Sequence, residues 1–196
     1  MSRVNIGYAI NGAFPTTVGG TGTTVKYWPN VPGPSIGVSN TTPSSTSSNG
    51  QLNVPGANKL NGQLFEVAIV GAVSIDPSIS CPSVEVALYA NTAANGATPS
   101  YTKIATTGAV TPGNTDFEAF RLSLAVSGDT RSGILQGSQT AFFNGSLQNS
   151  TPKALTANLS GLNFATDPVF GLVAGITFGT SGAKNLGMLW QFSLSS

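Results

Sequence analysis

The chain has 196 residues, of which 40% are hydrophobic and only 8% are charged, and its formal net charge is +1. Ordinary soluble proteins contain about 25% charged residues, and disorder needs low hydrophobicity together with high charge. The composition therefore predicts a folded chain with a weakly charged surface. The lysines and arginines occur singly along the chain, and nucleic-acid binding depends on clustered cations, so we expect no nucleic-acid partner.

Residues 1–60 are predicted to form an extended N-terminal arm rich in Gly, Ser, Thr and Pro. Four prolines between residues 30 and 58 leave no room for a helix or a central strand. The part before them contains short strand-like segments and four aromatic residues, Tyr8, Phe14, Tyr27 and Trp28. These four residues either pack on their own domain or contact a neighbouring subunit or a capsid, and both alternatives stay open.

Residues 61–196 are predicted to form an antiparallel β-sandwich. Apolar side chains alternate with small or polar ones over 65–75, 84–89, 119–126, 170–178 and 186–194, and more weakly over 101–105, 132–143 and 153–158. Successive side chains of a strand point to opposite faces of the sheet, and no segment has an apolar stripe at helical spacing. About eight strands over this length predict an all-β, eight-stranded jelly roll, with an immunoglobulin-like sandwich as the main alternative.

The alternation also predicts which side chains form the core. We expect buried positions at Phe120, Leu122, Leu124, Phe170, Leu172, Ile176, Trp190 and Phe192. Three apolar residues, Val169, Val173 and Leu189, fall outside these series. They are predicted either to contact another subunit or to lie under the N-terminal arm of the same chain.

The residue types present argue against catalysis. Histidine is absent and Cys81 is the single cysteine, which removes Ser-His-Asp and Cys-His chemistry and leaves zinc without ligands. Glu66 and Glu85 could meet by chance as a carboxylate pair of the kind used in glycoside hydrolysis. Solvated strand charges balanced by Arg121 or Lys103 are the simpler interpretation. We therefore expect no enzyme activity, no cofactor and no metal.

Two further features bear on location and ligands. The longest apolar run, 67–73, is far too short to span a membrane, and the first five residues lack the apolar region of a secretory signal, so we expect synthesis in the cytoplasm and no membrane partner. Carbohydrate binding is the main alternative among ligand functions, because sugar-binding sandwiches stack a sugar on exposed aromatic rings. Tyr89 and Tyr101 are the candidates for that role.

The C-terminal strands resemble a known family. The segments 120–124, 133–137 (GILQG), 159–164 (LSGLNF) and 170–178 (FGLVAGITF) look like those of the jelly-roll head decoration, or cement, proteins of tailed bacteriophages. The resemblance covers residues 60–196. It implies a homotrimer that binds the major capsid protein on the outside of the capsid, resides in the virion after synthesis in the host cytoplasm, and has no catalytic residues. A carbohydrate-binding β-sandwich module and a phage tail or spike component remain as alternatives.

Overall fold

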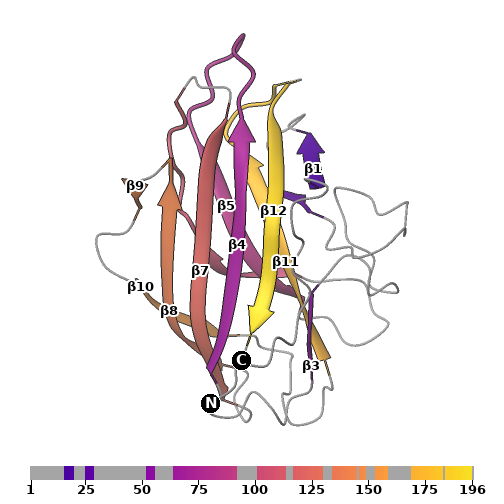
Figure 1. Cartoon of the computed structure of the whole chain (residues 1–196), viewed down its shortest axis with the longest axis vertical. Coiled ribbons are helices and arrows are strands. Elements are labelled where there is room, and N and C mark those ends of the chain that lie inside the picture. Colours follow the sequence, from indigo (N-terminus) through magenta and orange to yellow (C-terminus); the bar gives the residue numbers. More distant parts are fainter. Residues whose placement is uncertain are drawn as a thin grey trace.

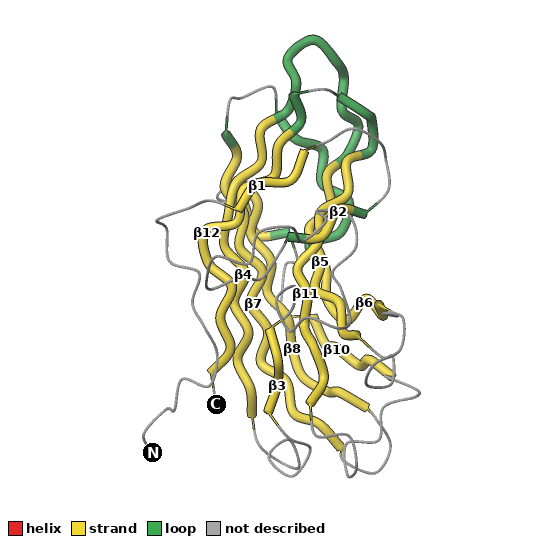
Figure 2. The backbone as a smooth tube through the Cα atoms, turned by 90° about the vertical axis from the view of Figure 1, so that its right-hand side faces the viewer, coloured by secondary structure: helices red, strands yellow, loops and turns green. Residues whose placement is uncertain are grey.

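The computed structural model describes eleven stretches of the chain: 16–19, 25–28, 52–55, 64–91, 101–113, 117–129, 134–144, 146–148, 153–158, 169–182 and 184–195. These stretches form two antiparallel sheets that lie face to face (Figures 1 and 2). None of the described residues is helical, so none of them forms a helix that could cross a membrane. The predicted fold class, an all-β antiparallel β-sandwich, is confirmed.

The larger sheet has seven strands and faces the viewer in Figure 1. Its order is β1 (Thr16–Gly19), β12 (Leu186–Ser195), β4 (Leu64–Ser74), β7 (Glu118–Asp129), β8 (Ile134–Phe143) and β10 (Lys153–Asn158). The two-residue strand β9 (Ser146–Leu147) pairs with β8 outside this order.

The smaller sheet has five strands, in the order β2 (Lys26–Tyr27), β11 (Val169–Phe178), β5 (Val84–Asn91) and β6 (Tyr101–Thr106), with β3 (Leu52–Pro55) pairing to β11. The described part of residues 61–196 thus contributes nine strands, including the short β9, beside the eight predicted. The predicted domain boundary at residue 60 lies outside the described residues.

Short strands from the first 60 residues belong to both sheets. β1 pairs with β12 in the larger sheet, and β2 and β3 both pair with β11 in the smaller one. Pro55 ends β3, which lies at an edge of its sheet, where a residue without an N–H group is tolerated. The described parts of the predicted arm are therefore built into the sandwich of their own chain.

A single core fills the space between the sheets, and it follows the predicted alternation. Six of the expected core residues are at most 3% exposed: Phe120, Leu122, Leu124, Leu172, Ile176 and Phe192. The side chain of Phe170 is outside the described part. Because apolar residues recur at every second position, each apolar series faces the opposite sheet. Burial of these side chains between the sheets is the main contribution to the stability of the fold.

The prediction for Trp190 is wrong, because its side chain is 38% exposed whereas that of Leu189 is completely buried in the core. The cause is a β-bulge in β12. Leu189 pairs with Gly71 and Gln191 pairs with Val70, so Trp190 is an extra residue between two consecutive partners. A bulge reverses the relation between residue number and sheet face along the strand. The expected single series from 186 to 194 is therefore two series of opposite phase.

Trp28 also lies in the core, with a side chain that is 0% exposed. Its backbone N–H donates to the carbonyl of Ala174 at 3.0 Å, and its indole Nε1 donates to the carbonyl of Gly187 at 3.1 Å. Its ring lies 5.9 Å from that of Phe120. A tryptophan held this way by both sheets completes the core of its own chain and does not reach a neighbouring subunit.

Two loops at one end of the sandwich are joined by buried polar groups. Asp76, which follows β4, accepts hydrogen bonds from the Ser78 backbone and hydroxyl at 3.0 and 2.6 Å and from the Lys184 backbone at 3.2 Å. The Asp76 backbone N–H donates to Oδ1 of Asn185 at 2.9 Å. The hydrogen bonds that the Asp76 carboxylate accepts from Ser78 and Lys184 lower its pKa, and the side-chain bond from Ser78 contributes most.

Candidate functional site

The outer side of the larger sheet carries a set of exposed apolar side chains. Five large hydrophobic residues among the described ones are exposed: Leu64, Phe117, Phe142, Leu147 and Trp190. Four of them lie in strands of this sheet, and the fifth directly precedes β7. Phe65, Phe143 and Leu189, which are their neighbours in the chain, are buried in the core. Successive side chains of a strand point to opposite faces, so the exposed residues next to these three point away from the core.

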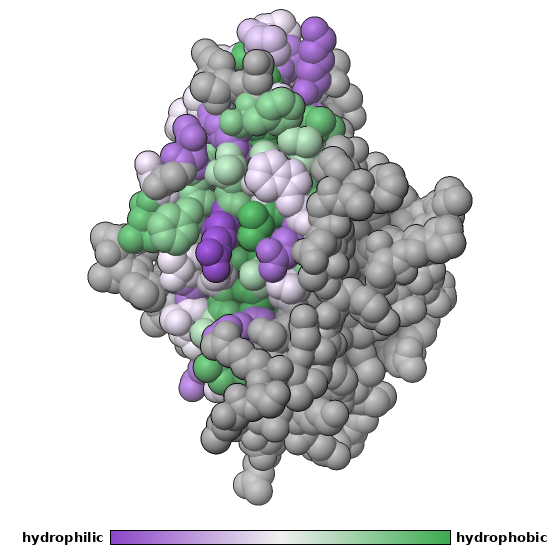
Figure 3. All heavy atoms as spheres, in the orientation of Figure 1, coloured by the Kyte–Doolittle hydropathy of each residue, from purple (hydrophilic) through white to green (hydrophobic). Residues whose placement is uncertain are grey.

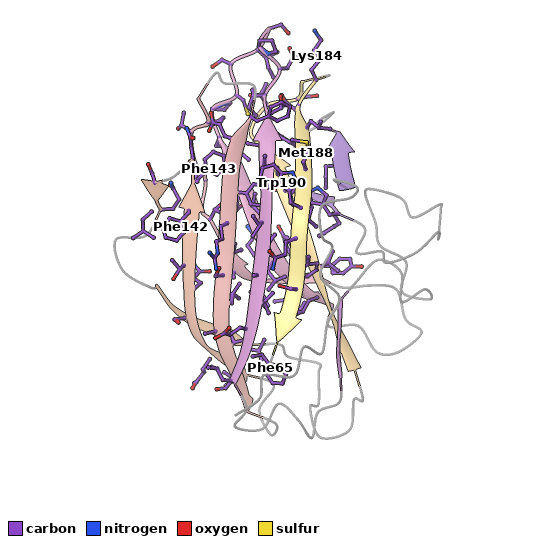
Figure 4. The ribbon with its side chains drawn as sticks, viewed as in Figure 1. Phe65, Phe142, Phe143, Lys184, Met188 and Trp190 are labelled. Atoms are coloured by element: carbon purple, nitrogen blue, oxygen red, sulfur yellow. The ribbon has the colours of Figure 1, made fainter. Side chains whose placement is uncertain are left out.

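A single row of this face combines aromatic, apolar and cationic groups. The pairing register aligns Phe142, Arg121, Val70 and Gln191 across four adjacent strands, with Trp190 in the bulge beside them. Leu147 pairs directly with Phe142. Figure 4 shows Trp190 and Phe142 on the side of the sheet that faces the viewer, and Figure 3 shows apolar and polar surface intermixed there. We call the set Phe142, Arg121, Val70, Leu147 and Trp190 the aromatic face.

Arg121 is exposed at the centre of the aromatic face. Its Nε atom donates to the Ser123 hydroxyl two residues along the same strand, at 2.9 Å. This bond orients the guanidinium group along the sheet surface, while its remaining N–H groups can donate to a partner. Trp and Arg are over-represented among the residues that dominate protein–protein binding energy.

The outer side of the smaller sheet carries a different group, three tyrosines of which Tyr27 contacts the other two. The Tyr27 ring lies 5.3 Å from that of Tyr89 in an edge-to-face arrangement, and 4.8 Å from that of Tyr101 at a tilt of 38°. Tyr89 is buried, while Tyr27 and Tyr101 are half-buried. We call these three residues the tyrosine cluster. The structure thus brings both predicted sugar-site residues together and adds one residue that was predicted as a subunit or capsid contact.

Gly175 has no side chain, and this leaves room for the rings of the tyrosine cluster. It pairs with Tyr27, and a Cβ atom at this position would lie 3.0 Å from Cε2 of Tyr89 and 3.2 Å from Cδ1 of Tyr27. Two rings therefore pack over the bare backbone of β11 at a distance that a side chain would disturb.

Charged groups adjoin the tyrosine cluster. Nζ of Lys103 donates to both carboxylate oxygens of Glu85 at 2.8 and 2.9 Å, and the Thr106 hydroxyl donates to Oε1 at 2.6 Å. Lys103 pairs directly with Tyr89 across the β5–β6 ladder. The Glu85–Lys103 balance of charge expected from the sequence is confirmed.

A second bulge brings these charged groups to one face. Leu88 pairs with Ala105 and Tyr89 with Lys103, which leaves Ile104 as the extra residue of β6. Lys103 and Thr106 are three positions apart and would face opposite sides in a regular strand. The extra residue lets both reach Glu85 on the outer side. Sequence alternation alone offered no sign of this.

Burial and hydrogen bonding determine the protonation states of the tyrosine cluster and of Glu85. Burial raises the pKa of Tyr101 to about 12, and it also raises the pKa values of Tyr27 and Tyr89. Burial works against ionisation of Glu85, but the hydrogen bonds from Lys103 and Thr106 and the Lys103 charge outweigh it and lower its pKa. At neutral pH this face therefore carries neutral phenols beside a carboxylate–ammonium pair.

Of the remaining predicted contact residues, the structure describes the side chains of Val173 and Leu189 only. Tyr8 and Phe14 lie outside the described residues, as does the side chain of Val169. Val173 and Leu189 are completely buried within their own chain, which leaves neither side chain exposed for a subunit contact.

The carboxylate pair considered from the sequence does not form. Glu66 and Glu85 alternate with core residues of different sheets, so they project from opposite sides of the sandwich. Within the described stretches, no three side chains of the metal-binding types come together.

No protein-family model and no curated protein matches this sequence. Solved structures that share the general sandwich arrangement include a seed lectin of Lotus tetragonolobus, with a TM-score of 0.42, 10% identity, and coverage of 97% of this chain and 98% of that one. Another is the CBM2 module of the evolved Dit of Lactobacillus casei BL23 phage J-1, with a TM-score of 0.39, 12% identity, and coverage of 98% and 95%.

Proposed function

We propose that this chain is a non-catalytic structural protein of the virion, a capsid decoration protein that binds the outer surface of the capsid through its aromatic face. The observation that carries the proposal is the row Phe142, Arg121 and Val70 on an outer sheet surface, with Trp190 in the bulge beside it. Large exposed apolar groups on a sheet are typical of surfaces that bind another protein. The resemblance of the C-terminal strands to phage cement proteins supplies the identity of the partner, the major capsid protein, and the homotrimeric state.

The composition suits permanent attachment to a shell. With a net charge of +1, the chain gains little from long-range electrostatic attraction, so shape and burial of apolar surface would provide most of the affinity. Trp190 and Arg121 are the residue types that most often supply such affinity, typically about 2 kcal/mol or more each when truncated. Many copies on one particle would convert a modest affinity into lasting attachment.

The proposal is tested by cosedimentation of the purified full-length chain with capsids of its own virus that lack it. Trp190→Ser should weaken capsid binding about 30-fold or more, which corresponds to about 2 kcal/mol. Arg121→Ser should weaken it in the same direction. Lys103→Gln lies on the other sheet and serves as the matched control, so its capsid affinity should stay within about twofold of wild type.

Two results would contradict the proposal. One is the absence of this chain from purified virions in quantitative mass spectrometry. The other is a Trp190→Ser variant that keeps its fold by circular dichroism and still binds capsids as tightly as the wild type does.

A further inference from the structure

The tyrosine cluster and the Glu85–Lys103 pair lie on the outer side of the smaller sheet, so they remain accessible when the aromatic face is occupied. The two faces belong to different sheets of one sandwich. Any ligand of the tyrosine cluster would thus bind independently of a capsid. We propose that the tyrosine cluster, together with Glu85 and Lys103, is a binding site for neutral saccharides.

The site combines the types of group that a sugar ring requires. A pyranose ring has an apolar C–H surface and a rim of hydroxyl groups, so its binding needs aromatic surface next to hydrogen-bonding groups. Tyr27 and Tyr101 are half-buried and leave part of each ring accessible, and the side chains of Lys103 and Glu85 are 41% and 24% exposed. Small-molecule sites typically combine aromatic walls with a few fixed polar groups in this way.

The groups of this site are held in place before a ligand arrives. The buried Tyr89 packs against the edge of Tyr27, and Tyr27 contacts Tyr101. Glu85 is fixed by Lys103 and Thr106. Binding to fixed side chains costs less conformational entropy than binding to mobile ones.

The charge of the site favours one class of ligand. Lys103 and Glu85 neutralise each other at 2.8 Å, so the site has no net charge with which to attract an anion or a cation. Both groups keep hydrogen-bonding capacity, because the ammonium has a further N–H and the carboxylate a further lone pair beyond the bonds described. Sugar hydroxyls both donate and accept, and they match such a pair. An uncharged saccharide is favoured over a sialylated or sulfated one.

The competing explanation is that the three tyrosines only cover the sheet and stabilise it. Under that explanation, truncating Tyr101 would lower stability, and no saccharide would bind. Changing Lys103, which is exposed, would then have no effect on any ligand. Binding measurements therefore separate the two explanations where stability measurements cannot.

The test starts with the labelled full-length chain, clustered on a multivalent carrier, on an array of neutral and acidic glycans. The affinity for the best neutral glycan is then measured by saturation-transfer NMR titration. Tyr101→Ala and Lys103→Gln should each weaken binding by about tenfold or more, whereas Tyr101→Phe, which keeps the ring, should lose less than Tyr101→Ala. Phe142→Ser on the aromatic face is the control and should change the affinity by less than about twofold.

An array without signal from neutral glycans, or with signal from acidic glycans alone, would overturn the proposal. So would a Lys103→Gln variant that binds as the wild type does, and this result remains informative if Tyr101→Ala fails to fold. Loss of capsid binding in Trp190→Ser with intact glycan binding would leave this inference standing, because the two functions are measured on different faces.

Discussion

Asp76, a buried acid, makes the stability of the protein depend on pH. Its hydrogen bonds from Ser78 and Lys184 lower its pKa below the ordinary value of 3.8. A lowered folded-state pKa means that the stabilising contribution is complete above the ordinary pKa and is lost as the pH falls through the folded-state pKa. The two loops that Asp76 joins should therefore loosen in acid.

We expect Asp76→Asn to lower the free energy of unfolding at neutral pH, because the amide replaces an acceptor-only carboxylate among N–H and O–H donors. The difference in the free energy of unfolding between variant and wild type should shrink as the pH falls below the ordinary pKa and through the lowered pKa of the wild-type carboxylate, which then also becomes protonated. Denaturant unfolding of both proteins at several pH values measures this difference. A difference that is zero at neutral pH, or that stays constant into acid, would show that these bonds do not contribute in this way.

In β12, Gly187 packs closely against Trp28, so a substitution at this position tests the packing between the two sheets. A Cβ atom at Gly187 would lie 2.7 Å from Cζ2 of Trp28 and 3.0 Å from Cδ1 of Ile176. Neither side chain can withdraw, because both are completely buried. We expect Gly187→Ala to destabilise the protein by about 1–3 kcal/mol through overpacking.

Trp28→Phe provides the control for this prediction, since the smaller ring removes the obstructing atoms. The cost of Gly187→Ala should be smaller in the Trp28→Phe background than in the wild type, and a double-mutant cycle from denaturant unfolding measures the difference. Equal costs in the two backgrounds would mean that Trp28 does not oppose the added methyl group.

The elements also show how far the sequence could predict the fold and the sites. Alternation was sufficient for the sandwich and for core residues such as Leu122 and Leu172, because two-residue periodicity directly records which side of a strand is buried. The alternation gave the wrong face for Trp190, because the order of apolar residues does not show where a bulge shifts the register. Trp28 was left open between two alternatives, because pairing between β2 and β11 joins residues about 150 positions apart in the chain, which no local pattern reports.

The candidate sites were predictable only in part. Tyr89 and Tyr101 were expected to be available to a sugar, but their contact with Tyr27 depends on pairing across the whole smaller sheet. The aromatic face was missed, because its two aromatic residues lie on strands β8 and β12 with β7 and β4 between them. Only the register of all four strands, together with the bulge in β12, shows that Trp190 lies beside the row that contains Phe142.

Under the proposed function, capsid binding and the contact between subunits use different surfaces of the protein. The homotrimer implied by the resemblance should appear in light scattering at micromolar concentration as three times the chain mass of 19.8 kDa. Trp190→Ser should keep this mass while it loses capsid binding, because the aromatic face is assigned to the capsid. A variant that falls to the mass of a single chain would reassign the aromatic face to the contact between subunits.

The bulge in β12 has a consequence for how this protein can change over generations. Val70 and Gly71 are neighbours in β4, yet their partners Gln191 and Leu189 are separated by Trp190. Removing the codon for Trp190 would leave both pairs intact and every later side chain on its present side of the sheet. A lineage could therefore lose or regain the indole ring of Trp190 on the aromatic face in one step, without rebuilding the core. Under the proposed function, natural variants that differ by one residue at this point would differ in capsid binding and not in fold.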